Sequence, residues 1–283
     1  SLMAYGSEKQ KDELLPQIIQ GKATFALALT EPEAGSDAGA IRTRATKVEG
    51  GWVVNGRKSW SSNAKQSIYM VTPCRTDPES VGHRGITMLL IPPDADGVHM
   101  TELQKVGNAG FKSWDIGLDD VFVADDQVMG EIGNGFRNLM STLHYARAGL
   151  AASATGQAQL AVDIAIKHAK ERVQFGNPIG SFQVIRHRLA DMQMRVDQAR
   201  LTTYHLADLI SREEPCRREA AQAKVIATEA LHYVADHGMQ ILASAGYAAE
   251  SDMQRIWRDA RLYTFGEGSN EIQRNIIARE LGL

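Results

Sequence analysis

Residues 185–210 read IRHRLADMQMRVDQARLTTYHLADLI. Apolar or small side chains recur along this stretch at alternating steps of four and three residues, at Ile185, Leu189, Met192, Val196, Ala199, Thr203, Leu206 and Ile210. Side chains with this spacing lie on one face of an α-helix. A helix this long with a continuous apolar face is typical of a bundle, in which neighbouring helices cover that face.

The helical pattern extends on both sides of this stretch, from Gly135 to the C-terminus. Gly176–Gly180, which includes a proline, interrupts it on one side, and Glu213–Pro215 interrupts it on the other. We expect two further helices, one roughly over Arg217–Ala243 and one from Ser269 onward. The C-terminal part is therefore predicted to be an antiparallel helical bundle.

Before Gly135 the sequence has the pattern of β-strands. Apolar and β-branched runs alternate with turn residues and predict strands at Phe25–Leu29, Trp52–Val54, Ile68–Val71, Ile86–Ile91 and Val121–Val123. Gly50-Gly51 and Asn55-Gly56 flank the second run as turn dipeptides, which favours a hairpin there. The N-terminal part is therefore predicted to be a β domain.

A short helix is predicted before the first strand. Ser7 and Gln10 stand three residues apart, the spacing at which two side chains cap each other's backbone N–H groups at a helix start. Pro16 lacks an N–H group and is expected to bend or end this helix. The first ten residues are polar and charged, so we do not expect them to act as a secretory signal.

The composition argues against several classes of protein. Of the 283 residues, 43% are hydrophobic and 23% charged, which suits a folded domain with a buried core. The 31 basic and 34 acidic residues give a net charge of −3, whereas a protein that grips nucleic acid usually carries a basic excess. No apolar run is long enough to cross a bilayer. Because Cys74 and Cys216 lie far apart, we expect no disulfide framework and a reduced, soluble, intracellular protein.

Short motifs do not identify the chemistry. The chain has neither a P-loop nor the Gly-x-Ser-x-Gly turn of many hydrolases. Gly130, Gly133 and Gly135 form a cluster, but a turn that leads into a helix explains it better than a dinucleotide-binding loop. The eight histidines include no His-Glu-x-x-His pair, so we expect no metal site.

Four longer segments carry more information when they are taken together. They read LTEPEAGSD at Leu29–Asp37, NGRKSWSSN at Asn55–Asn63, ERVQFG at Glu171–Gly176, and RDAR followed by EGSNEIQR within Arg258–Arg274. In this order, and over nearly the whole chain, the four segments resemble the acyl-CoA dehydrogenase family. Any one of them alone would be a weak signal.

The resemblance implies an α+β fold. A middle antiparallel β-barrel or sandwich domain is expected over residues 23–127, followed by a C-terminal four-helix-type bundle over residues 128–283. Residues 1–22 resemble the end of the family's N-terminal helical domain, and we expect the rest of that domain to be absent.

The resemblance also implies FAD as the cofactor. A flavin needs hydrogen bonds along its polar edge and an apolar wall against its ring. By position in the family motifs, the residues expected to bind it from the β domain are Leu29, Thr30, Gly35, Ser36, Trp60, Ser61 and Ser62. Those expected from the helical part are Arg172, Gln174, Phe175, Gln183, Gln240, Ser269 and Glu271. In the family the residues at the positions of Arg172, Phe175 and Gln240 reach the adenine end from a neighbouring subunit.

The implied reaction is α,β-desaturation of an acyl-CoA thioester. Glu267 falls at the family's position for the base that removes the α-proton while hydride passes from the β-carbon to flavin N5. Some family members place the base in the helix after the β domain, but this chain has Ala146 there, which cannot act as one. The residues implied to bind substrate are Ser36, His144, Tyr145, Arg147 and Gly268.

Two departures from the family pattern bear on the site. Gly266 stands where relatives carry Tyr before the base, which suggests room for a branched or bulky acyl group. Ala243-Ser244 replaces a glycine pair that commonly follows the glutamine matched by Gln240, which would crowd the dinucleotide there.

Partners and alternatives follow from the same resemblance. It implies a homo-oligomer, a dimer or homotetramer, which passes electrons to an electron-transfer flavoprotein in fatty acid β-oxidation. The expected location is the bacterial cytoplasm or, in a eukaryote, the mitochondrial matrix, with no nucleic-acid or membrane partner. Two alternatives stay open: a flavin-dependent oxidase or monooxygenase of the same fold, and a truncated, non-catalytic binding fragment.

Overall fold

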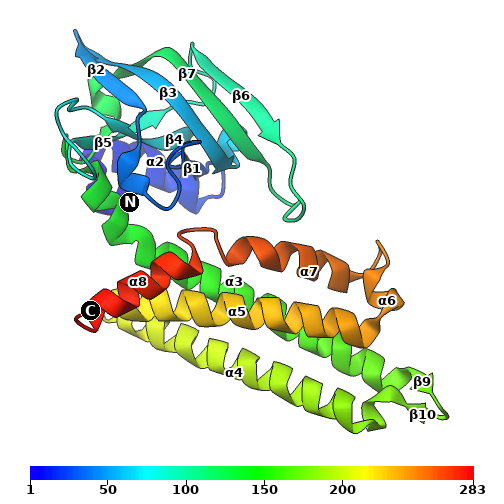
Figure 1. Ribbon diagram of the computed structural model, residues 1–283. Coiled ribbons are helices and arrows are strands. Elements are labelled where there is room, and N and C mark those ends of the chain that lie inside the picture. Colours follow the sequence, from blue (N-terminus) through cyan, green and yellow to red (C-terminus); the bar gives the residue numbers. More distant parts are fainter. The chain divides into compact units, whose positions relative to one another are not determined.

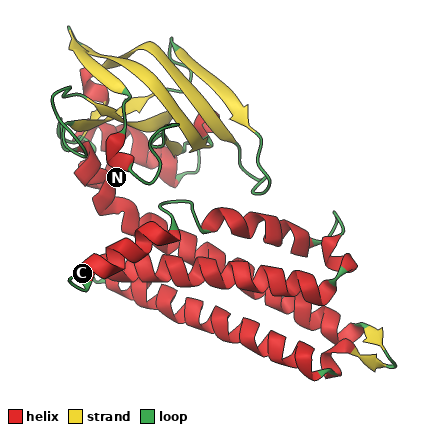
Figure 2. Cartoon of the chain, viewed as in Figure 1, coloured by secondary structure: helices red, strands yellow, loops and turns green.

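A computed structural model describes all 283 residues, which form two compact units. Unit 1 comprises Ser1–Lys105 and Ala109–Thr142, and unit 2 comprises Val106–Asn108 and Leu143–Leu283. Strands are concentrated in unit 1 and helices in unit 2 (Figures 1 and 2), so the predicted α+β class is confirmed. The family-based boundaries at residues 23 and 128 stay a prediction.

Unit 1 is built on one eight-stranded sheet. Its strands are β1 (Phe25–Leu27), β2 (Arg44–Val48), β3 (Gly51–Ser62), β4 (Tyr69–Arg75), β5 (Ile86–Ile91), β6 (Val98–Leu103), β7 (Ser113–Ala124) and β8 (Val128–Met129). They follow the order β6-β7-β3-β2-β4-β5-β8, and β1 pairs with β4. Three 3₁₀ turns, η1 (Ala38–Ala40), η2 (Ala64–Gln66) and η3 (Asp125–Gln127), connect them. All five runs predicted to be strands lie within or overlap strands of this sheet.

The sheet is mixed, whereas a wholly antiparallel one was expected. Phe25–Leu27 of β1 runs parallel to Tyr69–Val71 of β4, and β2 is also parallel to β4 where Arg44 pairs with Arg75. Parallel pairing needs a crossover connection, and the chain between β1 and β4 supplies one through η1, β2 and β3.

One predicted turn is wrong. Gly50 does turn the chain between β2 and β3, with its φ at 73°, but Asn55-Gly56 lies inside β3. Gly56 has a φ of 152° at a register shift in the pairing of β3 with β7. A Cβ at this position would approach the Cα of Thr43 to 2.7 Å, so glycine is required by close approach within the sheet.

The N-terminus forms two helices, α1 (Leu2–Tyr5) and α2 (Glu8–Ile19). The predicted capping box at the start of α2 is confirmed: Ser7 Oγ accepts from Gln10 N, and Gln10 Oε1 accepts from Ser7 N. Pro16 does not end α2, which continues to Ile19. Pro16 and Asp12, whose carbonyl loses its helical partner, are both exposed, so water can satisfy that carbonyl.

Unit 2 is helical. Its elements are the part of α3 (Gly135–Glu171) that follows Thr142, then β9 (Val173–Gln174), β10 (Asn177–Pro178), η4 (Ile179–Ser181), α4 (Gln183–Ser211), α5 (Arg217–Leu242), α6 (Ser244–Tyr247), α7 (Asp252–Tyr263) and α8 (Asn270–Glu280). The helices predicted over residues 185–210, 217–243 and from 269 onward are confirmed as α4, α5 and α8.

Small side chains let the long helices of unit 2 approach one another closely. Figure 1 shows α3, α4 and α5 side by side, and their shared core is rich in alanine, including Ala158, Ala199 and Ala227, each fully buried. The shorter helices α6, α7 and α8 each contact α5. No helix in the chain combines the length and the hydropathy that a membrane span requires.

Candidate active site

An exposed aromatic side chain stands on the predicted flavin-binding segment of unit 1. The pairing of β3 with β7 shifts register between Lys58 and Ser61, and Trp60 within this bulge has a φ of 58°. A positive φ is unusual for a bulky residue and is common where strain serves a function. Trp60 is 54% exposed, and Ser62 is exposed two residues later. Ser61 is buried instead, and its hydroxyl has no hydrogen-bond partner.

The segment with Leu29 and Thr30 lies directly beside this bulge. Ser59 N donates to Thr30 O at 2.8 Å, and Lys58 Nζ donates to Leu29 O at 3.3 Å. Both Leu29 and Thr30 are half-buried. The structure therefore brings the first two sequence segments of unit 1 together around Trp60.

The rest of this segment is open to a ligand. Gly35 and Ser36 are exposed, and a Cβ added at Gly35 would meet no protein atom within 4 Å. Exposed hydroxyls, an exposed indole and open backbone are the donor set that a flavin edge and its phosphates need. The residues of unit 1 thus fit the cofactor that the sequence predicts.

Glu267 lies in unit 2, at the middle of the loop between α7 and α8. Its φ is 55°, and the next residue, Gly268, has a φ of 89°. The loop is closed at its base, where Asn270 N donates to Thr264 O at 2.9 Å. Gln273 Nε2 donates to the carbonyl of Gly268 at 3.1 Å and also reaches that of Glu267 at 3.4 Å. These bonds hold Glu267 in a strained conformation that an isolated loop would avoid.

Burial and nearby positive charges have opposite effects on the pKa of Glu267. Its side chain reaches the surface, yet the protein around it removes enough water that burial raises the pKa of the carboxyl above its ordinary value. The positive charges of Arg147 and Lys224 act in the other direction. Such a carboxylate suits proton transfer to and from a weak carbon acid.

Arg147 is the predicted substrate residue with the clearest environment. It is only 8% exposed, its Nε has no hydrogen-bond partner, and burial lowers its pKa although Glu267 opposes this. A buried guanidinium with a free donor can bind an anionic or carbonyl oxygen. His144 and Tyr145 precede it on α3, with ring centroids 4.1 Å apart.

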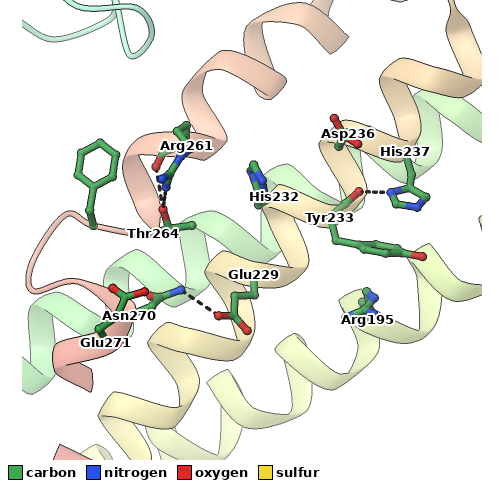
Figure 3. Close-up of a pocket in the computed structure, with 11 residues that line it drawn as sticks. Arg195, Glu229, His232, Tyr233, Asp236, His237, Arg261, Thr264, Asn270 and Glu271 are labelled. Atoms are coloured by element: carbon green, nitrogen blue, oxygen red, sulfur yellow. Dashed lines mark hydrogen bonds between the residues drawn. The ribbon is translucent and has the colours of Figure 1, made fainter. Parts of the chain in front are cut away.

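A pocket of about 600 Å³ borders the Glu267 loop (Figure 3). Thr264, Asn270 and Glu271 line it from the loop and the start of α8, while Glu229 and Tyr233 line it from α5. Asn270 donates to Glu229, as Figure 3 shows. Of the residues predicted for the cofactor, only Glu271 lines this pocket, and nearby Ser269 caps α8 by accepting from Ile272 N.

The other predicted cofactor residues lie elsewhere on unit 2. Gln174 and Phe175 are in the hairpin of β9 and β10, just after Arg172, and Gln183 begins α4. Phe175 is 93% exposed with a φ of 51°. Figure 1 shows this hairpin at one end of the bundle, away from the loop between α7 and α8. A single chain therefore does not bring the residues of this hairpin to Glu267. Gln240 is exposed near the end of α5.

Sequence reasoning missed Lys224, which is fully buried on α5. The signal was present in the helical pattern. Ala220, Ala227 and Leu231 share its helix face and are all buried, so a lysine occupies a core position. A charge in the apolar register of a bundle helix calls for a structural or functional reason.

Known proteins resemble this chain over nearly its whole length. The chain matches two family descriptions, "Acyl-CoA dehydrogenase, middle domain" over residues 26–121 and "Acyl-CoA dehydrogenase, C-terminal domain" over residues 133–282. The probable acyl-CoA dehydrogenase YngJ of Bacillus subtilis (strain 168) is 39% identical over 281 residues, which are 99% of this chain and 74% of that protein.

Two further relatives carry information on partners and ligands. CarC, a subunit of the caffeyl-CoA reductase-Etf complex of Acetobacterium woodii, is 38% identical over 278 residues, 98% of this chain and 73% of CarC. The solved structure of PigA with FAD and proline superposes with a TM-score of 0.96 at 29% identity, over 100% of this chain and 74% of that one.

Proposed function

Because the chain belongs to the acyl-CoA dehydrogenase family of oxidoreductases, we propose that it desaturates an acyl-CoA thioester between the α- and β-carbons, with Glu267 as the base. The observation that carries this proposal is the environment of Glu267. Its carboxylate sits on a loop flanked by two glycines, in a left-handed conformation, and its pKa is raised by burial.

Glu267 removes the α-proton. That proton is weakly acidic, so a carboxylate of ordinary pKa is a poor base for it, and further loss of water when substrate binds strengthens the base. Backbone N–H groups of the glycine-flanked loop are suited to hydrogen-bond the thioester carbonyl as negative charge develops on it. Arg147 holds the CoA end together with His144 and Tyr145, and Ser36 and Gly268 complete the set of substrate contacts.

FAD, when bound, supplies the acceptor for the hydride that leaves the β-carbon. Trp60 covers the ring, while Thr30, Ser62 and backbone near Leu29 bind its polar edge. The side chain of Ser61 faces the interior, so Ser61 contacts the flavin through its backbone. Gly35 and Ser36 hold the phosphates. The FAD-bound state of the structural relative PigA supports the same cofactor here.

The remaining cofactor residues contact the FAD that is bound by a neighbouring copy of the chain. The hairpin of β9 and β10, which carries Gln174 and Phe175 between Arg172 and Gln183, lies away from the loop between α7 and α8, and Phe175 is almost fully exposed. Gln240 is exposed near the end of α5. We therefore propose a homodimer or homotetramer in which these residues cover the adenine end of a neighbour's FAD, while Ser269 and Glu271 act within their own chain.

The acyl group is branched or bulky. Gly266, next to the base, has an ordinary φ, and a Cβ there would make one close contact, with Leu262 O at 3.3 Å, and would meet no other protein atom within 4 Å. Apart from this one contact, the position is open beside Glu267. Electrons pass to an electron-transfer flavoprotein, as the Etf-complex relative CarC suggests. The reaction belongs to fatty acid β-oxidation, in the bacterial cytoplasm or the mitochondrial matrix.

The absorption spectrum of the purified protein, before and after anaerobic addition of acyl-CoA esters, tests this proposal. We expect a flavin band that branched acyl-CoA bleaches more efficiently than unbranched medium-chain acyl-CoA. Reoxidation by an electron-carrier dye but not by oxygen would separate the dehydrogenase from an oxidase or monooxygenase. A colourless protein that cannot be reconstituted with FAD would contradict the proposal and favour a binding fragment.

A further inference from the structure

Lys224 carries a charge into the core of unit 2. Its side chain is fully buried, yet its ammonium is not paired with a carboxylate and donates to two neutral acceptors instead. Burying an ammonium group without an ion pair is costly. Burial indeed lowers the pKa of Lys224 to about 8, although the carboxylate of Glu267 opposes this. The groups that contact Lys224 indicate what role this buried charge has.

The two acceptors are the two ends of the Glu267 loop. Lys224 Nζ donates to Thr264 O at 3.2 Å and to Asn270 Oδ1 at 2.8 Å. Thr264 ends α7, and Asn270 begins α8. Glu267 stands three residues from each, so one ammonium group on α5 joins both anchors of the loop (both are labelled in Figure 3).

Neighbouring side chains fix Asn270 as an acceptor. Thr228 lies one turn after Lys224 on α5 and donates to the same Asn270 Oδ1 at 3.2 Å. Asn270 Nδ2 donates to Glu229 Oε1, which also accepts from Arg274 at 2.6 Å. The amide of Asn270 is therefore held at both ends, and its oxygen faces Lys224.

We propose that Lys224 is a positioning residue for Glu267: it clamps both ends of the loop from Thr264 to Asn270 and places a positive charge near the carboxylate. This inference rests on the proposed function of Glu267 as the base. The clamp keeps the base in its strained, left-handed conformation, and the charge favours the ionised carboxylate that proton removal requires.

The charged groups that act on Glu267 and Lys224 can be named one by one. Arg147 and Lys224 both lower the pKa of Glu267 against the effect of its burial. Lys224 in turn faces Glu267, Arg147, Glu271 and Glu229. Replacing Lys224 by a neutral side chain therefore leaves Arg147 as the main positive charge on Glu267, and the pKa of Glu267 should rise.

Lys224→Met is the main test variant, because it removes the charge and leaves each acceptor one donor. Thr264 O keeps Asn270 N, and Asn270 Oδ1 keeps Thr228 Oγ1. Thr228→Val is the matched control, because it removes one bond to Asn270 and keeps the charge. Lys167→Met, at an exposed position on α3, controls for loss of a lysine.

Three measurements on the holoenzyme follow. Hydrogen exchange of the amides at residues 265–269 should accelerate about tenfold or more in Lys224→Met and stay unchanged in Lys167→Met. The carboxyl resonance of Glu267 should titrate at higher pH in Lys224→Met but not in Thr228→Val. With acyl-CoA, Lys224→Met should lose about a hundredfold in kcat with little change in KM, and the acid limb of its kcat profile should move to higher pH.

Unchanged loop exchange and unchanged Glu267 titration in Lys224→Met would overturn the clamp whether or not the protein is active. If both change but no acyl-CoA bleaches the wild-type flavin, the proposed function fails while the clamp on the loop stands. If Lys224→Met does not fold, Asn270→Ala decides, because it keeps the ammonium and removes its side-chain acceptor. Unchanged loop exchange in that variant would equally overturn the proposal.

Discussion

Lys58 and Glu31 form a buried ion pair in unit 1, with Nζ 2.8 Å from Oε1 and side chains 0% and 3% exposed. Lys58 also donates to the carbonyls of Leu29 and Pro73, and Glu31 accepts from the backbone N–H groups of Arg42 and Thr43. This pair therefore ties the predicted flavin-binding segment to β3 and β4.

Removing one partner of this pair should be costly, because it leaves the other charge buried without compensation. We expect Lys58→Met to lower the free energy of unfolding of unit 1 by about 3–5 kcal/mol. Lys47→Met is the control, since its ion pair with Asp125 is exposed and should contribute less than about 1 kcal/mol. Denaturant unfolding followed by tryptophan emission measures the free energy of unfolding of both variants. Equal losses in Lys58→Met and Lys47→Met would show that the buried ion pair is no more important for stability than the exposed one.

Ala243 is held in a conformation that suits glycine. Its φ is 51° and its ψ is −132°, directly after α5. Such a conformation costs a residue with a Cβ about 1–3 kcal/mol, partly offset by the greater flexibility of unfolded glycine. We expect Ala243→Gly to raise the thermal midpoint of unit 2. Ala245→Gly, in the short helix α6, should lower it, and a lower midpoint for Ala243→Gly as well would refute the strain.

Gly266 should set the width of the acyl site. A Cβ at this position meets only Leu262 O, at 3.3 Å, and needs no unusual φ, so we expect the fold to accept Gly266→Tyr with a small shift of the backbone at Leu262. We expect kcat/KM for branched acyl-CoA to fall at least about tenfold relative to that for a straight-chain ester. Gly156→Ala, at an open position on α3, should leave that ratio unchanged. A ratio that is the same for Gly266→Tyr and wild type would show that this position does not select the substrate.

The raised pKa of Glu267 should make the stability of the fold depend on pH. Burial raises this pKa in the folded state, so folding favours the protonated form. The stabilisation is complete below the ordinary carboxyl pKa and is lost as pH rises through the raised pKa. We therefore expect the free energy of unfolding of the wild type minus that of Glu267→Gln, measured without substrate, to fall with increasing pH. A difference that grows with pH would mean that Arg147 and Lys224 outweigh burial.

The sequence predicted much of the fold because its periodicities are strong. The alternating steps from Ile185 to Ile210 gave α4 almost to its ends, and the run Ile86–Ile91 is β5 itself. The parallel pairing of β1 was not predictable in the same way, because it depends on where a distant strand returns. Asn55-Gly56 resembles a turn locally, but its pairing within the sheet overrides that preference.

The site was predictable only in part. Family motifs pointed to Glu267 and Trp60, and the structure adds their positive φ values, which no composition or spacing reveals. Lys224 could have been found as a lysine in an apolar helix register. Its link to Thr264 and Asn270 could not, because those contacts join α5 to a loop about forty residues later and depend on how the helices pack.

The rate of anaerobic flavin bleaching by acyl-CoA is the measurement that depends most directly on Glu267 as the proposed base. Glu267→Gln keeps the size and most hydrogen bonds of the side chain but cannot accept a proton at neutral pH. We expect this variant to retain FAD and to bind acyl-CoA, while the bleaching rate falls by about 10²–10⁴-fold. A bleaching rate within a few-fold of wild type would contradict the role of Glu267 as the base.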